Sequence, residues 1–199
     1  MRVLLVGDEE SKYLWDHYRP DMIGRIDLIL STGDLKAEYL EFLVTMLSCP
    51  CYYVHGNHDE KYIKNPPGGC DSAEDTVVRF NGLRIMGLGG CAAYKKAEFH
   101  YTERQMSRRA RRLRFKLLRS GGVDIILTHA PAAGYEHTDS FAHRGFDVFN
   151  RLIDRYHPAY FIHSHVHLSY GANIPVKSRR GSTTIINACG WQVLELEDR

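Results

Sequence analysis

The sequence predicts an α/β fold in which parallel strands alternate with helices. Five short apolar runs have the length and the β-branched or aromatic content of buried strands, and each stops abruptly at polar residues. Segments with helical spacing lie between several of them, which is typical of a sheet with parallel strands at its centre. The five runs are RVLLVGDEE (2–10), IDLILSTGD (26–34), CYYVHGNHD (51–59), VDIILTHAP (123–131) and AYFIHSHVH (159–167).

Two helices are predicted from apolar residues that recur on one face, over 35–47 and 146–156. The apolar faces carry Leu40, Leu43, Val44 and Leu47 in the first segment and Phe149, Leu152, Ile153 and Tyr156 in the second. Two further stretches indicate antiparallel pairs. Asn81-Gly82 stands between alternating runs and is a strong hairpin signal, and 182–197 is expected to be a second strand pair, broken at Gly190.

The bulk composition is that of an ordinary globular chain. Its 199 residues predict a single domain over 1–199, with 44% hydrophobic residues and a net charge of +2, so the charge demands no acidic partner. No run approaches the roughly 18 apolar residues of a spanning helix, and the start of the chain is too short for a signal peptide, so no membrane partner is expected. Five scattered cysteines without a CxxC pair predict reduced thiols in a cytoplasmic protein.

Polar side chains follow all five predicted strands. Because the carboxyl ends of such strands converge on one edge of a sheet, these residues are expected to meet there. They are Asp8, Glu10, Asp34, Asn57, His58, Asp59, His129, His165 and His167. Carboxylates, imidazoles and one amide oxygen suit Mn²⁺, Fe or Zn²⁺. The set is too large for one ion but sufficient for two ions about 3.5–4 Å apart that share a carboxylate.

In this order, the residues resemble the motifs of the calcineurin-like metallophosphoesterases, which run D-x-H, G-D, G-N-H-D, a lone His and G-H-x-H. Here the motifs are Asp8-x-Glu10, Gly33-Asp34, residues 56–59, His129 and His165-x-His167. The resemblance implies a four-layer αββα sandwich, in which two facing mixed β-sheets have helices outside. It also implies hydrolysis of a phosphomonoester or phosphodiester by a hydroxide that bridges two divalent metal ions, Mn²⁺ first, with Fe or Zn²⁺ as alternatives.

The same resemblance implies a role for each residue. Asp34 would be the carboxylate that both metals share. Asp8 and His167 would bind one metal, and the other would be held by Asn57, His129 and His165. His58 would protonate the leaving oxygen or stabilise charge on the phosphoryl group. Asp59 would hold His58 in orientation.

Two positions depart from the family pattern. Glu10 stands where the family has a histidine; a glutamate oxygen reaches about as far, so Glu10 is expected to bind metal and to favour harder ions. Ser164 replaces the glycine of G-H-x-H, which is expected to alter the loop slightly. A weaker similarity in 128–145 places Asp139 and His143 on the substrate side.

Other interpretations remain open at this point. Taken singly, Asp8 or Asp34 could cap a helix, and the histidines could be turn or surface residues. The basic segment 103–120 predicts an amphipathic helix with Met106, Ala110, Leu113 and Leu117 in its packed stripe. Its cationic face is expected to be solvated, with phosphate or nucleic-acid binding as the alternative. The alternative functions are a nuclease acting on DNA or RNA and a non-catalytic metal-binding scaffold of the same fold, and the oligomeric state is undetermined.

Overall fold

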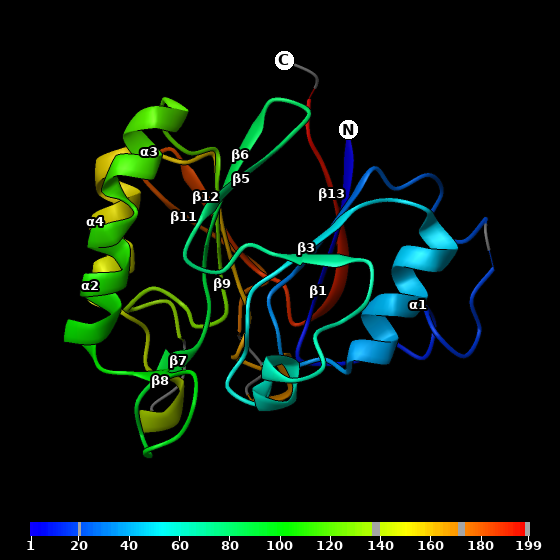
Figure 1. The fold of residues 1–199 in the computed structure, drawn as a ribbon, viewed down its shortest axis with the longest axis horizontal. Coiled ribbons are helices and arrows are strands. Elements are labelled where there is room, and N and C mark those ends of the chain that lie inside the picture. Colours follow the sequence, from blue (N-terminus) through cyan, green and yellow to red (C-terminus); the bar gives the residue numbers. More distant parts are fainter. Residues whose placement is uncertain (20, 137–139, 171–173, 198–199) are drawn as a thin grey trace.

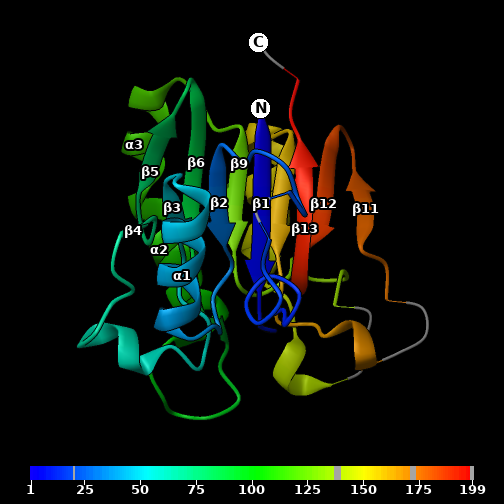
Figure 2. The ribbon, with the colours of Figure 1, turned by 90° about the vertical axis from the view of Figure 1, so that its right-hand side faces the viewer.

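The computed structural model describes residues 1–19, 21–136, 140–170 and 174–197, and two β-sheets face each other in it (Figures 1 and 2). The first sheet has the order β13 (Gly190–Glu195), β1 (Arg2–Gly7), β2 (Leu28–Ser31), β3 (Cys51–Tyr53), β4 (Cys70–Ser72). The second has the order β11 (Lys177–Arg180), β12 (Thr183–Asn187), β10 (Tyr160–His163), β9 (Ile125–Thr128), β6 (Leu83–Leu88), β5 (Val77–Phe80). A separate short pair joins β7 (Cys91–Ala92) to β8 (His100–Tyr101).

Both large sheets are mixed. Strands β1 to β4 are parallel to one another, and β13 is antiparallel to β1. In the second sheet β6, β9, β10 and β12 are parallel, and the edge strands β5 and β11 are antiparallel to their neighbours. The parallel strands of each sheet therefore end on the same edge.

Helices cover the outer faces of the two sheets (Figure 1). The first sheet carries α1 (Ala37–Leu47), and the second carries α2 (Glu103–Arg112), α3 (Arg114–Ser120) and α4 (Asp147–Tyr156). Short 3₁₀ helices form at Glu60–Ile63, Phe141–His143 and Leu168–Tyr170. The four-layer sandwich and the two amphipathic helices are confirmed.

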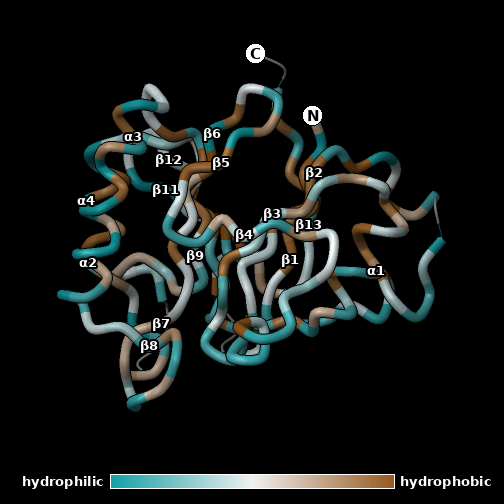
Figure 3. The backbone as a smooth tube through the Cα atoms, in the orientation of Figure 1, coloured by the Kyte–Doolittle hydropathy of each residue, from teal (hydrophilic) through white to brown (hydrophobic). Residues whose placement is uncertain are grey.

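The central strands are continuous apolar runs because they are buried on both faces. Leu5 and Leu30 point into the cluster between the sheets, whereas Leu4 and Ile29 pack with Leu40 of α1. On the other side, apolar residues of α2, α3 and α4 pack on β9 and β10. Figure 3 shows hydrophobic colour along the central strands and hydrophilic colour mainly in the outer loops. No helix among these described residues is both long enough and apolar enough to cross a bilayer.

One of the two predicted strand pairs is correct. Strands β5 and β6 form the expected hairpin, and Asn81 (φ 46°) and Gly82 (φ 84°) have the positive φ values that a two-residue type I′ turn requires. The predicted pairing within 182–197 is wrong. Strand β12 pairs with β10 in the second sheet and β13 pairs with β1 in the first. The short link that ends at Gly190 (φ 80°) carries the chain from one sheet to the other and does not form a hairpin.

The basic segment also differs from the prediction. The stripe of Met106, Ala110, Leu113 and Leu117 is buried as expected. However, the helix is interrupted at Leu113, so two helices form. Arg109 on the face expected to be solvated is buried, because its guanidinium pairs with Glu74 and Asp75.

Candidate metal centre

The predicted polar residues follow the carboxyl ends of β1, β2, β3, β9 and β10. In Figure 1 this is the end of the sandwich opposite the chain's N-terminus. The first sheet supplies Asp8, Asp34 and Asn57, and the second sheet supplies His129 and His165. The candidate site therefore lies where the two sheets meet.

Four of these side chains form a tight cluster. One ligand atom from each of Asp8, Asp34, His129 and His165 lies within 4.8 Å of the others. His129 Nε2 is 3.0 Å from Asn57 Oδ1, 3.0 Å from His165 Nδ1 and 3.5 Å from Asp34 Oδ2. Such short separations between atoms that bind metals are those of one coordination shell.

Hydrogen bonds to backbone carbonyls determine which ring nitrogens are free to bind. His129 Nδ1 lies 2.9 Å from Thr32 O, and His165 Nε2 lies 2.9 Å from Ala142 O. Because a carbonyl oxygen only accepts, each of these nitrogens carries the proton. In the neutral rings His129 Nε2 and His165 Nδ1 then present lone pairs to each other and to the oxygens of Asp34 and Asn57. A bound cation, or an added proton, is needed to offset the repulsion between these acceptor atoms.

The electrostatics of the two rings differ. Burial, followed by the nearby His129, lowers the pKa of His165 to about 2, so this ring stays neutral. Burial also lowers the pKa of His129, but the surrounding carboxylates, led by Asp34, outweigh it and the net pKa is raised. Metal binding requires neutral imidazole, which the carbonyl contacts and the burial of His165 favour.

Three of the predicted ligand residues have an unusual backbone. Asp8 (φ 58°), Asp34 (φ 57°) and His165 (φ 67°) occupy the left-handed region, which residues other than glycine enter at a cost. Such strain clusters at functional sites, because the surrounding structure must hold it in place. Here two of the carboxylates are anchored. Asp8 Oδ2 accepts the backbone N–H of His165 at 2.8 Å, and Asp34 Oδ1 accepts the backbone N–H of His58 at 2.7 Å.

Gly56 and Asp59 support the carboxylate of Asp34. A Cβ at position 56 would lie 1.9 Å from Asp34 Oδ1, so only glycine fits there. Asp59 Oδ2 accepts the N–H groups of Asp34 (2.9 Å) and Gly56 (2.7 Å). Burial, and then the charge of Asp34, raise the pKa of Asp59 to about 6.

The structure leaves the ring of His58 exposed at the rim of the cluster. Among the described residues, Asp59 contacts backbone N–H groups and not this ring. The predicted orienting role of Asp59 is therefore not reflected in its contacts; Asp59 instead holds together the two loops that carry Asp34 and Asn57.

Glu10 is not part of the cluster. Its carboxylate accepts the backbone N–H of Lys36 at 3.0 Å and pairs with Lys36 Nζ at 2.8 Å. The neighbouring Glu9, which sequence reasoning missed, has Oε1 2.8 Å from His167 Nδ1. Cys189 joins these two in a second group whose ligand atoms lie within 4.8 Å of one another. Burial, then the charge of Asp8, raise the pKa of the Cys189 thiol to about 12.

His143 lies beside the cluster, with its ring centroid 4.9 Å from that of His165. Tyr170, also missed from the sequence, has its ring centroid 4.8 Å from those of His143 and His167. A tyrosine three residues after the second histidine of H-x-H was the available signal. Asp139, the other predicted substrate-side residue, lies outside the described residues.

Ser164, the second departure, is fully buried, and its hydroxyl lies 3.4 Å from His129 Nδ1. Ser164 therefore fits at this position, and His129 and His165 remain in contact.

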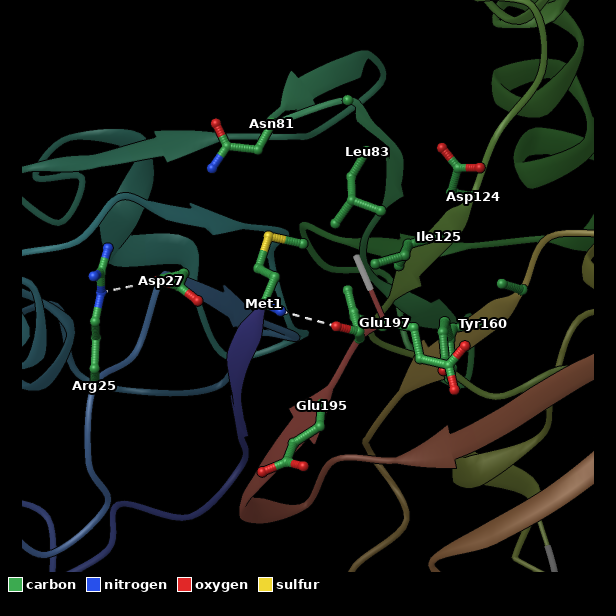
Figure 4. Close-up of a pocket in the computed structure, with 13 residues that line it drawn as sticks. Met1, Arg25, Asp27, Asn81, Leu83, Asp124, Ile125, Tyr160, Glu195 and Glu197 are labelled. Carbon is green, nitrogen blue, oxygen red and sulfur yellow. Dashed lines mark hydrogen bonds and ion pairs between the residues drawn. The ribbon is translucent and has the colours of Figure 1, made fainter. Parts of the chain in front are cut away.

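A cavity of about 990 Å³ opens at the other end of the sandwich. Met1, Leu83, Ile125 and Tyr160 line it, near the amino ends of β1, β6, β9 and β10, as Figure 4 shows. Three acidic side chains that line it pair with arginines: Asp27 with Arg25 at 3.2 Å, Asp124 with Arg84 at 2.7 Å and Glu195 with Arg2 at 3.5 Å. The predicted site residues lie elsewhere, at the carboxyl ends of the strands.

Comparisons with known proteins agree with this geometry. The sequence matches the model of the family described as calcineurin-like phosphoesterase over residues 3–169. No curated protein matches the sequence. One solved structure matches with a TM-score of 0.67 at 15% identity and covers 97% of this chain and 94% of that chain.

Two named structures are also similar. TT1561 of Thermus thermophilus matches with a TM-score of 0.58 at 15% identity, over 95% of this chain and 89% of that chain. Vps29 from Entamoeba histolytica, solved with Zn²⁺, matches with a TM-score of 0.47 at 15% identity, over 100% of this chain and 87% of that chain. The first likeness shows the fold alone, and the second is too weak to bear on this chain.

Proposed function

The chain belongs to the calcineurin-like phosphoesterase family, and from this premise we propose that it hydrolyses a phosphomonoester or phosphodiester with two divalent metal ions. The observation that carries the proposal is the convergence of His129, His165, Asn57 and Asp34 through acceptor atoms 3.0 to 3.5 Å apart. At such separations the acceptor atoms of these residues repel one another, and a divalent cation between them would remove that repulsion.

The donor set determines which ions suit the site. Asp34, Asn57, His129 and His165 would hold one ion, and Asp8 and His167 would contribute to the other, with Asp34 shared. When bound, the ions would polarise the phosphoryl oxygens and lower the pKa of water. For the oxygen- and nitrogen-rich cluster we propose Mn²⁺ first, with Fe or Zn²⁺ as alternatives.

The protein's own residues would then orient the ester and move a proton. His58 is the candidate acid, because the residue is exposed while its backbone N–H donates to Asp34 Oδ1 at 2.7 Å and fixes its position. It would give a proton to the leaving oxygen in a direct displacement without a covalent enzyme intermediate. His143 and Tyr170, which line the same edge, would contact the substrate.

The nuclease alternative depends on the basic helices. Exposed arginines gather on α2 and α3, including Arg111, Arg112 and Arg119. Figure 1, however, shows α3 at the end of the molecule that carries the N-terminus, and only α2 extends towards the other end, where the candidate site lies. The basic surface therefore gives less support to a nuclease than to a phosphoesterase acting on small esters.

A cytoplasmic location is also part of the proposal. The five cysteines are free thiols, which fits a reducing compartment. The catalytic interpretation, rather than the scaffold alternative, is supported by the retained His58 beside the cluster of Asp8, Asp34, His129 and His165.

A screen of the metal-reconstituted protein against aryl phosphomonoesters and phosphodiesters tests the function. His58→Ala is expected to lower kcat/KM by about 10²–10⁴-fold, the usual contribution of a general acid, with unchanged metal content. His17→Ala, which removes another exposed histidine, is the matched control and should behave as the wild type. Turnover that survives His58→Ala unchanged would reject the role of His58. Metal-loaded protein that hydrolyses none of these esters would favour the scaffold.

A further inference from the structure

A second group of potential metal ligands lies beside the first. Glu9, His167 and Cys189 each offer one ligand atom, and these three atoms lie within 4.8 Å of one another. The group combines a carboxylate oxygen, an imidazole nitrogen and a sulfur. Glu9 and Cys189 have no counterpart in the D-x-H or G-H-x-H motifs.

The fold explains how these residues meet. Strand β12 runs parallel to β10, with Asn187 opposite His163, so the residues after both strands reach the same edge. Cys189 follows β12 and His167 follows β10, while Glu9 follows β1 of the other sheet. Cys189 is buried, His167 is partly exposed and Glu9 is exposed, so the group is closed on the protein side and open towards solvent.

Asp8 connects the two groups. Its Oδ2 accepts the backbone N–H of His165 at 2.8 Å, and its Oδ1 lies 3.9 Å from His167 Nε2. The second group therefore stands where the family pattern expects the other metal ion.

Position 10, where the family pattern has a histidine, does not supply a ligand to this ion. Glu10 is held by both the backbone N–H and the ammonium group of Lys36. A carboxylate that accepts two charge-assisted or backbone bonds elsewhere is not available to this ion without breaking them. Glu9 and Cys189 lie beside His167, as Asp8 does, and offer ligand atoms in place of that histidine.

We propose that Glu9, His167 and Cys189 hold one of the two metal ions, and that this position selects a thiophilic ion such as Zn²⁺, Fe²⁺ or Co²⁺ over Mn²⁺. Together with Asp8 and the shared Asp34, these side chains would complete the ligands of the second ion, and a thiolate among them favours softer ions. The inference rests on the metal site of the proposed function and not on ester hydrolysis. The two metal positions of this protein then differ in their ion preference.

Glu9 acts in this proposal as a ligand and not merely as the acceptor of a hydrogen bond from His167 Nδ1. The two roles separate in Glu9→Gln, because an amide oxygen can still accept that hydrogen bond but is a poorer metal ligand than a carboxylate. Glu10→Gln is the matched carboxylate control.

The test loads the full-length, metal-free protein with Co²⁺ and records its near-ultraviolet absorption. Ligation by a thiolate produces a sulfur-to-cobalt charge-transfer band, which oxygen and nitrogen ligands do not. The wild type is expected to show this band and to bind about two equivalents of Co²⁺. Cys189→Ser should lose the band. Glu9→Gln should weaken binding of one equivalent by more than about 100-fold, beyond the roughly 10- to 100-fold that the loss of an outer-shell partner costs. Cys49→Ala, a matched loss of another buried thiol, and Glu10→Gln should leave both readouts unchanged.

X-ray absorption of the zinc-loaded wild type keeps the inference testable if Cys189→Ser does not fold. A zinc–sulfur distance of about 2.3 Å is expected. Two bound metals without a sulfur ligand would overturn the inference and leave the proposed function standing. An unchanged second equivalent in Glu9→Gln would overturn the assignment of Glu9. Sulfur-ligated metal in a protein that hydrolyses no phosphoester would reject the proposed function alone.

Discussion

The carboxyl group of Asp59 is buried beneath the candidate site and binds two backbone N–H groups, those of Asp34 and Gly56. A buried carboxylate next to the charge of Asp34 is costly, which is why the pKa of Asp59 is raised to about 6. Asp59 thus joins the loops after β2 and β3, and the burial of its charge opposes this stabilisation.

Asp59 should make the stability of the metal-free protein depend on pH. Because its pKa is higher in the folded than in the unfolded chain, the folded state binds the proton more tightly between pH 4 and 6. That stabilisation is complete below about pH 4 and is lost as the pH rises through 6. Asp59→Asn keeps an acceptor oxygen for both N–H groups and removes the charge. Relative to this variant, the wild type should lose on the order of 2 kcal/mol of unfolding free energy between pH 4 and 7.

Urea denaturation of both proteins at several pH values measures this difference. Asp16→Asn, at an exposed position, serves as the control and should track the wild type. Parallel pH profiles for wild type and Asp59→Asn would contradict the prediction.

At the scale of elements, α2 braces the loop that carries the site. Arg109 of α2 pairs with Glu74 and Asp75 and donates to Gly89 O at 2.8 Å. Glu74 Oε2 in turn accepts the backbone N–H of His55 at 3.0 Å and lies 3.0 Å from Nδ1 of its ring. His55 immediately precedes Gly56. Burial would raise the pKa of Glu74, but the bond to His55 and the charge of Arg109 lower it to about 2.

Removing Arg109 should therefore destabilise the protein far more than removing an exposed arginine. Arg109→Ala leaves the carboxylate of Glu74 without its main counter-charge, and breaking a buried pair in this way costs about 3–5 kcal/mol. Arg104→Ala on the exposed part of the same helix should cost less than about 0.5 kcal/mol. Equal unfolding midpoints in urea for the two variants would show that the buried pair does not matter.

For the whole molecule, the important feature is that the candidate ligands come from both sheets. Asp8, Asp34 and Asn57 belong to the first sheet, and His129 and His165 to the second. A metal bound there would connect the two sheets directly, and it would bind the folded chain but not the unfolded one.

Metal loading should accordingly raise the melting temperature. At about 100 times its Kd, a ligand stabilises the folded state by about 2.7 kcal/mol, which corresponds to about 5–10 °C for a chain of this size. Calorimetry or a thermal shift with Mn²⁺ and Zn²⁺, before and after chelation, measures the effect. Asp34→Asn should remove most of the shift, whereas Asp16→Asn should retain it. A shift that is the same in Asp34→Asn would place the bound ion elsewhere.

The sequence pattern by itself predicted parallel strands alternating with helices and the core of the site, whereas the four-layer sandwich was implied by the resemblance to the calcineurin-like family. Apolar runs buried on both faces predict strands wherever they occur, and polar residues that end those runs must gather where parallel strands end. Asp8, Asp34, His129 and His165 could be found in this way because each lies within three residues of the end of such a strand.

Only the tertiary structure decided the remaining features, because they depend on contacts between segments far apart in the chain. Nothing in the local sequence distinguishes Glu9 from Glu10. In the folded chain Lys36 pairs with Glu10, and His167 contacts Glu9. Cys189 reaches the site because β12 joins β10 and not β13, and Arg109 is buried because acidic partners from the 74–75 segment reach it. Local patterns specify which elements form, whereas long-range pairing energies select among neighbouring residues of similar chemistry.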